Sequence, residues 1–103
     1  MIFKTESLEL DIRLPDITEI GTFYKKIGFD LGNLRDEEFV KENNHIIYGG
    51  ILKCMFDMKL IVKVSGKAST PEELKADYTL FPEMSNVAVD YLSKLLIPEK
   101  KTT

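Results

Sequence analysis

Few side chains in this sequence could carry out nucleophilic or metal chemistry. The 103 residues include one cysteine, Cys54, and one histidine, His45. Cys54 lies in an alternating apolar run, which predicts a buried structural thiol, because a reactive thiol needs a cationic neighbour or a helix N-terminus. His45 follows two asparagines, and we expect it in an exposed turn. The alternative is a pH-sensitive or metal-binding group shared across a dimer.

An acidic run and two glycine segments have the composition of ligand sites but not their spacing. Loops that bind hard cations place oxygen ligands at alternating positions around a glycine turn, and residues 36–38 with Glu42 do not follow that pattern. The glycines at 49–50 and in the segment 66–69 lack the spacing of a phosphate-binding loop, so we expect them in turns. We therefore predict no catalytic residue, no metal site and no cofactor, and we favour a protein that is not an enzyme.

The composition is typical of one globular domain spanning residues 1–103. The chain has 17 acidic and 14 basic side chains and a formal net charge of −3. A balance this close to neutrality argues against a nucleic-acid binder that uses a broad basic surface. No apolar run approaches the roughly 20 residues that span a bilayer, and the first residues lack the order of a signal peptide. We expect a cytoplasmic protein with loose ends at 1–6 and 99–103.

The first elements expected along the chain are a strand and a helix. Leu8, Leu10, Ile12 and Leu14 alternate with polar residues, which is the period of a half-buried strand, and Pro15 ends it.

The helix is expected over residues 17–27. Asp16 is placed to cap it, and Glu19, three residues later, completes a capping box. Gly28 ends the helix, because glycine readily takes the left-handed conformation that closes a helix end.

Three short motifs in residues 9–32 form a pattern of their own. They are Pro15-Asp16 at the helix start, Phe23-Tyr24 within the helix and Ile27-Gly28-Phe29 at its exit. With them, this segment resembles the opening strand and helix of the vicinal oxygen chelate family, the glyoxalase and bleomycin-resistance fold. The resemblance implies a βαβββ module, two of which enclose a cavity that in many members holds a divalent metal with His and Glu ligands.

The rest of the chain departs from that family. Leu10-Asp11-Ile12 stands where a histidine ligand would be expected, and the chain ends in a helix rather than in a second module. If the resemblance extends to a ligand cavity, its expected lining is Tyr24, Phe29, Tyr48, Phe56 and Met58.

The segment 51–65 alternates without a break. Its even-numbered residues, from Leu52 to Val64, are all apolar. This period predicts either one long strand or two strands joined by a tight turn near Asp57. Because two-residue turns favour glycine, we prefer a hairpin in which residues 45–48 pair, across Gly49-Gly50, with the start of this strand.

The odd-numbered face of the same segment mixes apolar residues with lysines. An apolar residue on an exposed face needs a cover, which the helices of this chain or another chain could provide. A strand with free edge groups also allows pairing in a dimer, and lysines discourage unspecific pairing while permitting an acidic partner. The candidate interface consists of Ile51, Lys53, Met55, Lys59, Ile61 and Lys63.

Two helices are predicted towards the C-terminus. Thr70, Pro71 and Glu73 form a capping box with proline at the first helical position. Pro82 interrupts this helix, and a second helix carries apolar residues at helical spacing through Leu96. Residues 30–45 show no sustained period, so we expect a short strand there, followed by a loop or a brief helical turn.

These elements predict an α+β fold: a mostly antiparallel sheet with a long strand or hairpin, one helix after the first strand and two C-terminal helices packed on the sheet. By elimination of catalytic groups, we expect a small non-enzymatic protein-interaction module, such as an adaptor, inhibitor or accessory subunit of bacterial or phage type. Through its sheet it would bind another protein or a second copy of itself, and neither nucleic acid nor a membrane.

Two alternatives remain open. One is a glyoxalase-like dimeric protein that binds a small ligand or a metal. The other, more remote, is a chaperone similar to SecB. The resemblance to SecB-type chaperones covers the long strand, the Leu80-Phe81-Pro82 junction and the helix after it.

Overall fold

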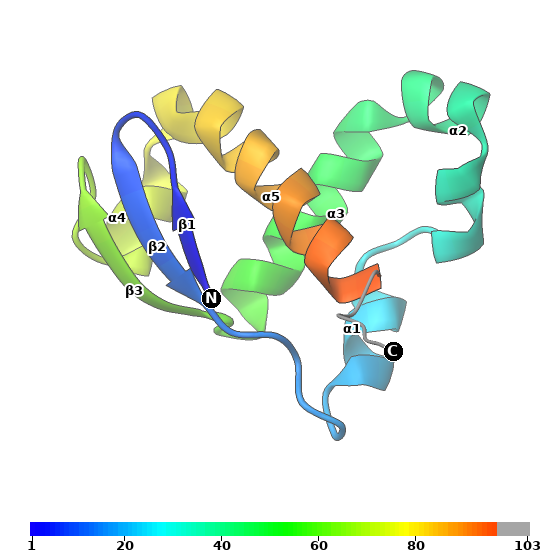
Figure 1. Ribbon diagram of the computed structural model, residues 1–103, viewed down its shortest axis with the longest axis horizontal. Helices are drawn as coiled ribbons and strands as arrows, with labels where there is room; N and C mark the ends of the chain where they lie inside the picture. The colour runs from blue at the N-terminus through cyan, green and yellow to red at the C-terminus, as the bar shows by residue number, and fades with distance from the viewer. Residues whose placement is uncertain (97–103) are drawn as a thin grey trace, which may run out of the picture.

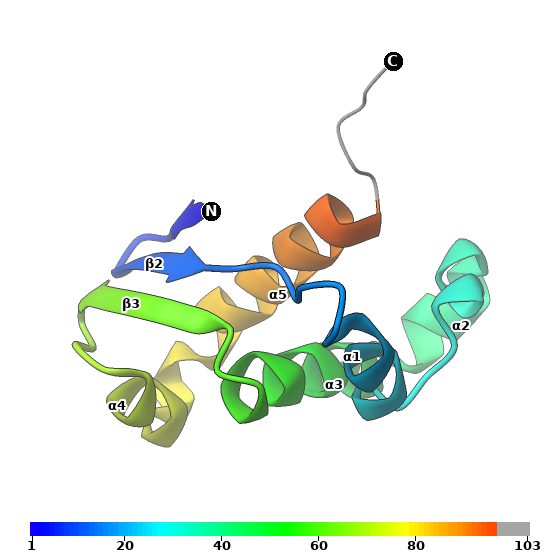
Figure 2. The ribbon, with the colours of Figure 1, turned by 90° about the horizontal axis from the view of Figure 1, so that it is seen from below.

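Three antiparallel strands form one layer of the structure, and the helices form the other (Figures 1 and 2). The computed structural model describes residues 1–96. The strands are β1 (Ile2–Lys4), β2 (Leu8–Ile12) and β3 (Ile61–Gly66); the helices are α1 (Ile20–Lys26), α2 (Glu37–Glu42), α3 (Asn44–Asp57), α4 (Pro71–Ala76) and α5 (Phe81–Leu96), with 3-10 turns η1 (Leu31–Arg35) and η2 (Tyr78–Leu80). This arrangement confirms the predicted α+β class with an antiparallel sheet.

The middle strand, β2, supplies most of the sheet's side of the core. Leu8, Leu10 and Ile12 are buried, whereas Glu9 and Asp11 lie on the opposite face of the sheet. β1 and β3 pair with β2 on either side, both antiparallel. The alternation predicted for this strand is confirmed.

β1 corrects the expectation that residues 1–6 are a loose end. Ile2–Lys4 pairs with β2, and the Ile12 N–H donates a hydrogen bond of 2.9 Å to the Met1 carbonyl. Phe3 is buried against α5, and burying a side chain of this size stabilises by about 1.5–3 kcal/mol, which accounts for the order of so short a strand. The other predicted loose end, 99–103, lies outside the described residues.

α1 follows a turn that is held by two carboxylate side chains, and a glycine ends it. Asp16 Oδ1 accepts hydrogen bonds from the N–H groups of Thr18 and Glu19, and Glu19 Oε1 accepts one from the Asp16 N–H. The predicted capping box is therefore present, although the helix itself begins only at Ile20. Gly28 has a φ of +83°, the left-handed conformation expected at the end of this helix.

The largest departure from the sequence-based prediction is α3. Residues 44–57 form one helix, so the predicted strand at 51–57 and the hairpin turn at Gly49-Gly50 are wrong. The alternation misleads because this helix is apolar around most of its circumference, and its apolar residues satisfy a period of two as well as the helical period. The residues that it buries follow the helical spacing: Ile47, Ile51, Cys54 and Met55.

α3 ends in a turn that has no glycine to mark it. Lys59 has a φ of 55°, its N–H donates to the Phe56 carbonyl at 3.2 Å, and the Leu60 N–H donates to the Met55 carbonyl at 2.9 Å. These are the two bonds of a Schellman motif, in which glycine usually takes the left-handed position. The chain then enters β3, so only the second part of the predicted long strand is a strand.

Two short helical segments replace the short strand predicted after α1. Asp30 caps η1 with its side chain. Asp36 Oδ1 accepts hydrogen bonds from the N–H groups of Glu38 and Phe39 and so caps α2. The acidic run 36–38 therefore starts the short helix α2, which agrees with the brief helical turn expected as the alternative to a loop.

Two C-terminal helices form as predicted, but the first already ends at Ala76, and Pro82 lies in the first turn of α5 instead of interrupting the first helix. Thr70 Oγ1 accepts a hydrogen bond of 3.1 Å from the Glu73 N–H, and Glu73 Oε1 accepts one of 2.9 Å from the Ser69 N–H. α5 buries the expected face, namely Met84, Val87, Ala88, Tyr91 and Leu92. No helix within residues 1–96 is long and apolar enough to cross a membrane.

α3 approaches the end of α1 closely at Gly50. A Cβ atom at this position would lie 2.0 Å from the carbonyl oxygen of Ile27, so no other residue fits without a shift of the backbone. A Cβ atom at the neighbouring Gly49 would meet nothing within 4 Å. Packing therefore requires a glycine at position 50 but not at position 49, although both residues lie inside α3.

Alanine variants of these glycines separate helix propensity from packing. Gly49→Ala should stabilise the chain by roughly 0.5–1 kcal/mol, because alanine favours the helix. Gly50→Ala should destabilise it by about 1–3 kcal/mol, because the methyl group collides with the Ile27 carbonyl. Urea unfolding of both variants measures the difference, and equal effects at the two positions would contradict the close approach.

An ion pair at the start of α1 predicts a pH dependence of stability. Two N–H groups of Arg13 donate to Glu19 Oε1 and Oε2 at 2.6 and 2.9 Å. These bonds, with that from the Asp16 N–H, lower the pKa of Glu19 from 4.5 to about 2. Because the pKa is lowered in the folded chain, the stabilisation is fully present above 4.5 and is lost as the pH falls towards 2.

Glu19→Gln should therefore cost stability at neutral pH and progressively less at acidic pH. Urea unfolding of the wild type and the variant, at pH values from about 7 to about 2.5, measures the difference. A difference that does not change over this range would rule out the pair as its source.

Candidate protein-interaction site

The six residues of the predicted interface do not form one exposed face. Ile51 and Met55 are fully buried on α3, and Ile61 is buried at the start of β3. The cause is the helix, because residues one turn apart in α3 both face the core, whereas a strand would have placed them on its outer face. The exposed members, which lie on α3, in the turn after it and on β3, are Lys53, Lys59 and Lys63.

The five residues predicted to line a ligand cavity are also dispersed. Tyr24 is half-exposed on α1, and Phe29 packs against a phenylalanine of α2. Tyr48 and Phe56 line different hollows at the two ends of α3, and Met58 is the C-cap of that helix. The structure does not bring these side chains together around one cavity.

The two side chains that could carry out nucleophilic or metal chemistry, Cys54 and His45, lie in different surroundings. Cys54 is buried, and burial raises the pKa of its thiol to about 11, which disfavours the reactive thiolate. His45 is exposed in the first turn of α3. Within residues 1–96, no three His, Cys, Asp or Glu side chains lie close enough together to hold a metal ion.

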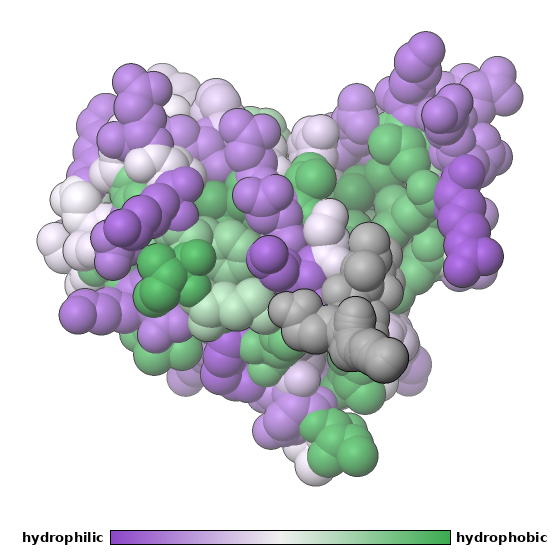
Figure 3. Space-filling view, viewed as in Figure 1, coloured by the Kyte–Doolittle hydropathy of each residue, from purple (hydrophilic) through white to green (hydrophobic). Residues whose placement is uncertain are grey.

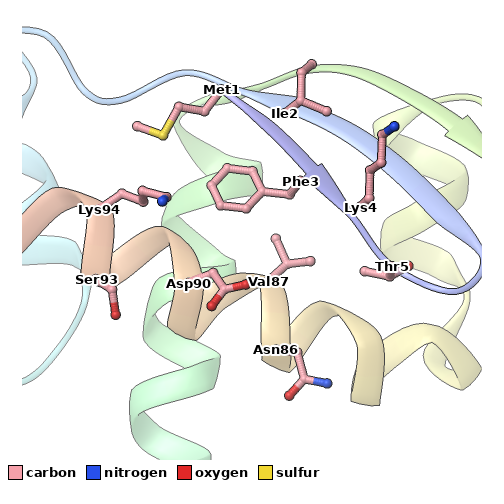
Figure 4. A pocket seen from close by; sticks show the side chains of 10 residues that line it. All are labelled: Met1, Ile2, Phe3, Lys4, Thr5, Asn86, Val87, Asp90, Ser93 and Lys94. Carbon is pink, nitrogen blue, oxygen red and sulfur yellow. The ribbon is translucent and has the colours of Figure 1, made fainter.

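Among the hollows that border α5, two lie beside its middle and C-terminal turns. The larger, of about 760 Å³, lies between α5, α3 and the segment 31–40, and Figure 3 shows it as an apolar surface between α5 and α2. The other, of about 470 Å³, lies between β1 and α5 (Figure 4). The second is the more distinctive, because one of its walls is the edge of a strand.

That edge of β1 carries backbone groups without a strand neighbour. Met1 and Thr5 make backbone hydrogen bonds of 2.9 Å with β2. Because bonded and non-bonded residues alternate in an antiparallel pair, Phe3 also directs its backbone groups to β2, whereas Ile2 and Lys4 direct theirs to the other side. β1 is the outermost strand of the sheet, so no strand within residues 1–96 receives the N–H and C=O groups of Ile2 and Lys4.

α5 forms the floor of the hollow beside this edge (Figure 4). In this view the Val87 side chain points from α5 towards β1, and Asp90 lies beside Val87. Lys94 lies nearer to Met1, at the other end of the hollow. The hollow thus combines an apolar centre with charged groups, and an extended backbone along the edge could place a side chain into it.

Tyr91 holds β1 against α5. Its side chain is fully buried, and its ring centroid lies 6.1 Å from that of Phe3 and 6.4 Å from that of Phe23 in α1. Its hydroxyl donates a hydrogen bond of 2.8 Å to the Arg13 carbonyl. Burial raises the pKa of this hydroxyl, so it keeps its proton and remains a donor.

Glu83 ties the other end of β1 to α5. Its carboxylate accepts hydrogen bonds from the Thr5 hydroxyl and, at 3.0 Å, from the Ser7 N–H. These two bonds hold the pKa of Glu83 below its usual range. Thr5 Oγ1 also accepts a bond of 3.0 Å from the Leu8 N–H, which closes the turn between the strands. The edge is therefore fixed at both ends relative to the floor of the hollow.

The outer face beside the edge is amphipathic. Lys4 Nζ lies 3.8 Å from Glu9 Oε1, and both side chains are largely exposed. Ile2, on the same face, is 57% exposed. Exposed ion pairs contribute only about 0–1 kcal/mol, so Lys4 could turn to a new partner at little cost.

The opposite edge of the sheet is less suited to pairing. The register of β3 against β2 shifts between Asp11 and Ile12, which marks an irregularity. Lys63 and Lys67 are exposed along this strand and just after it. Bulges and lysines are common protections against pairing at an edge. β1 is the better candidate for contact with another chain.

No local sequence pattern reveals this site. Residues 2–4 are too few to show a period, and the two apolar residues Ile2 and Phe3 stand side by side instead of alternating with polar residues. The hollow also needs α5, which comes from the other end of the described chain, and nothing in either segment alone predicts their contact.

The chain matches no known family model, no curated protein and no solved structure. The resemblance of residues 9–32 to the vicinal oxygen chelate family therefore stays a prediction from sequence. What bears on function is the geometry described above, and the open edge of β1 is its most specific feature.

Variants of Tyr91 test how firmly β1 is held. Tyr91→Phe keeps the ring contacts and loses the bond to the Arg13 carbonyl, so we expect a loss of about 1 kcal/mol in the free energy of unfolding. Tyr91→Ala also leaves a cavity, with an expected loss of about 3–5 kcal/mol. Urea unfolding measures both, and a loss below about 1 kcal/mol for the alanine variant would show that Tyr91 does not join these elements.

Proposed function

We propose that this chain is a small non-enzymatic protein-interaction module that binds a protein partner through its sheet, at the edge of β1. One observation carries the proposal: the backbone groups of Ile2 and Lys4 face away from β2, beside a hollow floored by α5. Sheet edges bind other chains through main-chain hydrogen bonds, and neighbouring pockets give the binding specificity. Both components are present here.

The surroundings of the edge favour protein as the ligand. A partner polypeptide supplies both donors and acceptors in the alternation that an antiparallel edge needs. The hollow offers apolar contact with the exposed Met1 and with the small open parts of the nearly buried Phe3 and Val87. It also offers charges from Asp90 and Lys94, and such a mixture is found at protein interfaces. As a cytoplasmic adaptor, inhibitor or accessory subunit of bacterial or phage type, the chain would act by occupying a segment of its partner.

Site-specific photo-crosslinking tests the proposal. Benzoylphenylalanine in place of Lys4 puts the reactive group at the edge, and the same replacement of Lys25, exposed on α1, is the matched control. After irradiation of cells that naturally produce the chain, we expect an adduct of discrete mass from position 4 and none from position 25. Adducts at position 25 alone, or at neither position, would overturn the proposal.

A further inference from the structure

We infer that the partner contributes an extended segment, which pairs with β1 as an antiparallel fourth strand above α5 and places an acidic side chain opposite Lys4. This inference rests on the proposed function, since it names what occupies the same site. The N–H and C=O groups of Ile2 and Lys4 have no strand partner within residues 1–96, and a partner chain that bonds to them must be extended where it does so. A helix bonds its own backbone groups internally and could not receive them.

The register of such a segment follows from the existing sheet. In an antiparallel pair, two of its residues exchange hydrogen bonds with Ile2 and Lys4, and the residue between them lies opposite Phe3. Side chains directly across neighbouring strands point to the same face, so this central side chain enters the hollow above α5. Phe3 and Val87 lie at the bottom of that hollow and are nearly buried, 6% and 2% exposed. An apolar central residue would cover the small part of their surface that is still open and extend the core above α5 (Figure 4).

Charge decides what lies opposite Lys4. On the outer face, Lys4 has Glu9 of β2 as its neighbour on one side, and no residue of the described part of the chain is its cross-strand neighbour on the other. A carboxylate opposite Lys4 continues the alternation of charge across the sheet, whereas a cation there would be repelled. An apolar residue opposite the exposed Ile2 would cover it. From its N-terminus to its C-terminus, the segment therefore has an acidic residue opposite Lys4, an apolar residue opposite Phe3 and an apolar residue opposite Ile2.

A second copy of the chain fits this edge poorly. Its own β1 would bring the packing of Phe3 on Tyr91, with ring centroids 6.1 Å apart, and therefore its own α5. That helix would enter the space beneath the edge, which α5 of the first copy already floors. An extended segment carries no such layer and can lie above α5 alone.

A peptide titration tests the inference. The probe is acetyl-Thr-Glu-Leu-Val-Thr-amide, and the matched control is acetyl-Thr-Val-Leu-Glu-Thr-amide, which has the same composition with the two outer positions exchanged. On adding the probe to the ¹⁵N-labelled full chain, we expect NMR shifts at the amides of Ile2 and Lys4 and along residues 87–94. The control should bind about threefold to tenfold more weakly. No shifts at Ile2 and Lys4, or equal binding of both peptides, would overturn the inference.

A charge exchange tests the position of the acidic residue. Lys4→Glu should reverse the preference, so that acetyl-Thr-Lys-Leu-Val-Thr-amide binds the variant more tightly than the original probe does. Lys4 is exposed, so the variant should fold, and its melting temperature checks this. An unchanged preference for the acidic probe would show that no carboxylate lies opposite Lys4.

The two proposals can fail separately. An adduct at position 4 without peptide shifts at Ile2 and Lys4 would leave the interaction module standing and overturn the extended segment. Light scattering of the chain alone adds a further outcome: a concentration-dependent dimer that protects the β1 amides would make a second copy the occupant and overturn the inference. Absence of both adduct and peptide shifts would overturn both.

Discussion

The arrangement of the sheet on the helices depends on the contacts made by the buried side chain of Tyr91. From α5 its ring contacts Phe3 of β1 and Phe23 of α1, and its hydroxyl bonds to the Arg13 carbonyl where the chain leaves β2. A buried tyrosine hydroxyl needs a partner, so the single hydrogen bond gives direction to an otherwise apolar contact. One side chain thereby joins β1, the exit of β2, α1 and α5.

The consequence for function is a strand edge that is held in place and left open. A strand as short as β1 has little stability of its own. Tyr91 beneath it and Glu83 at its end fix it to α5, so Ile2 and Lys4 present their backbone groups in a defined geometry. A site ordered before binding loses less conformational entropy when a partner arrives, and more of the contact energy is then available as affinity.

The sequence predicts those elements in which local chemistry and tertiary packing agree. The alternation of β2, the capping box at Thr70 and the apolar stripe of α5 are examples. α3 could not be recognised from Gly49 and Gly50, which locally favour a turn, because Gly50 is needed for a close approach to the carbonyl of Ile27 at the end of α1. The β1 edge could not be recognised either, since its order depends on Tyr91 far along the chain.

Hydrogen exchange of the β1 amides, followed by NMR, tests most directly the central claim that an ordered strand presents a free edge. The amides of Phe3 and Thr5 face β2 and should exchange slowly, whereas those of Ile2 and Lys4 should exchange almost as fast as in an unfolded chain. Protection of all four amides would show that the edge is covered, and protection of none would show that β1 is not ordered. Either result would contradict the account.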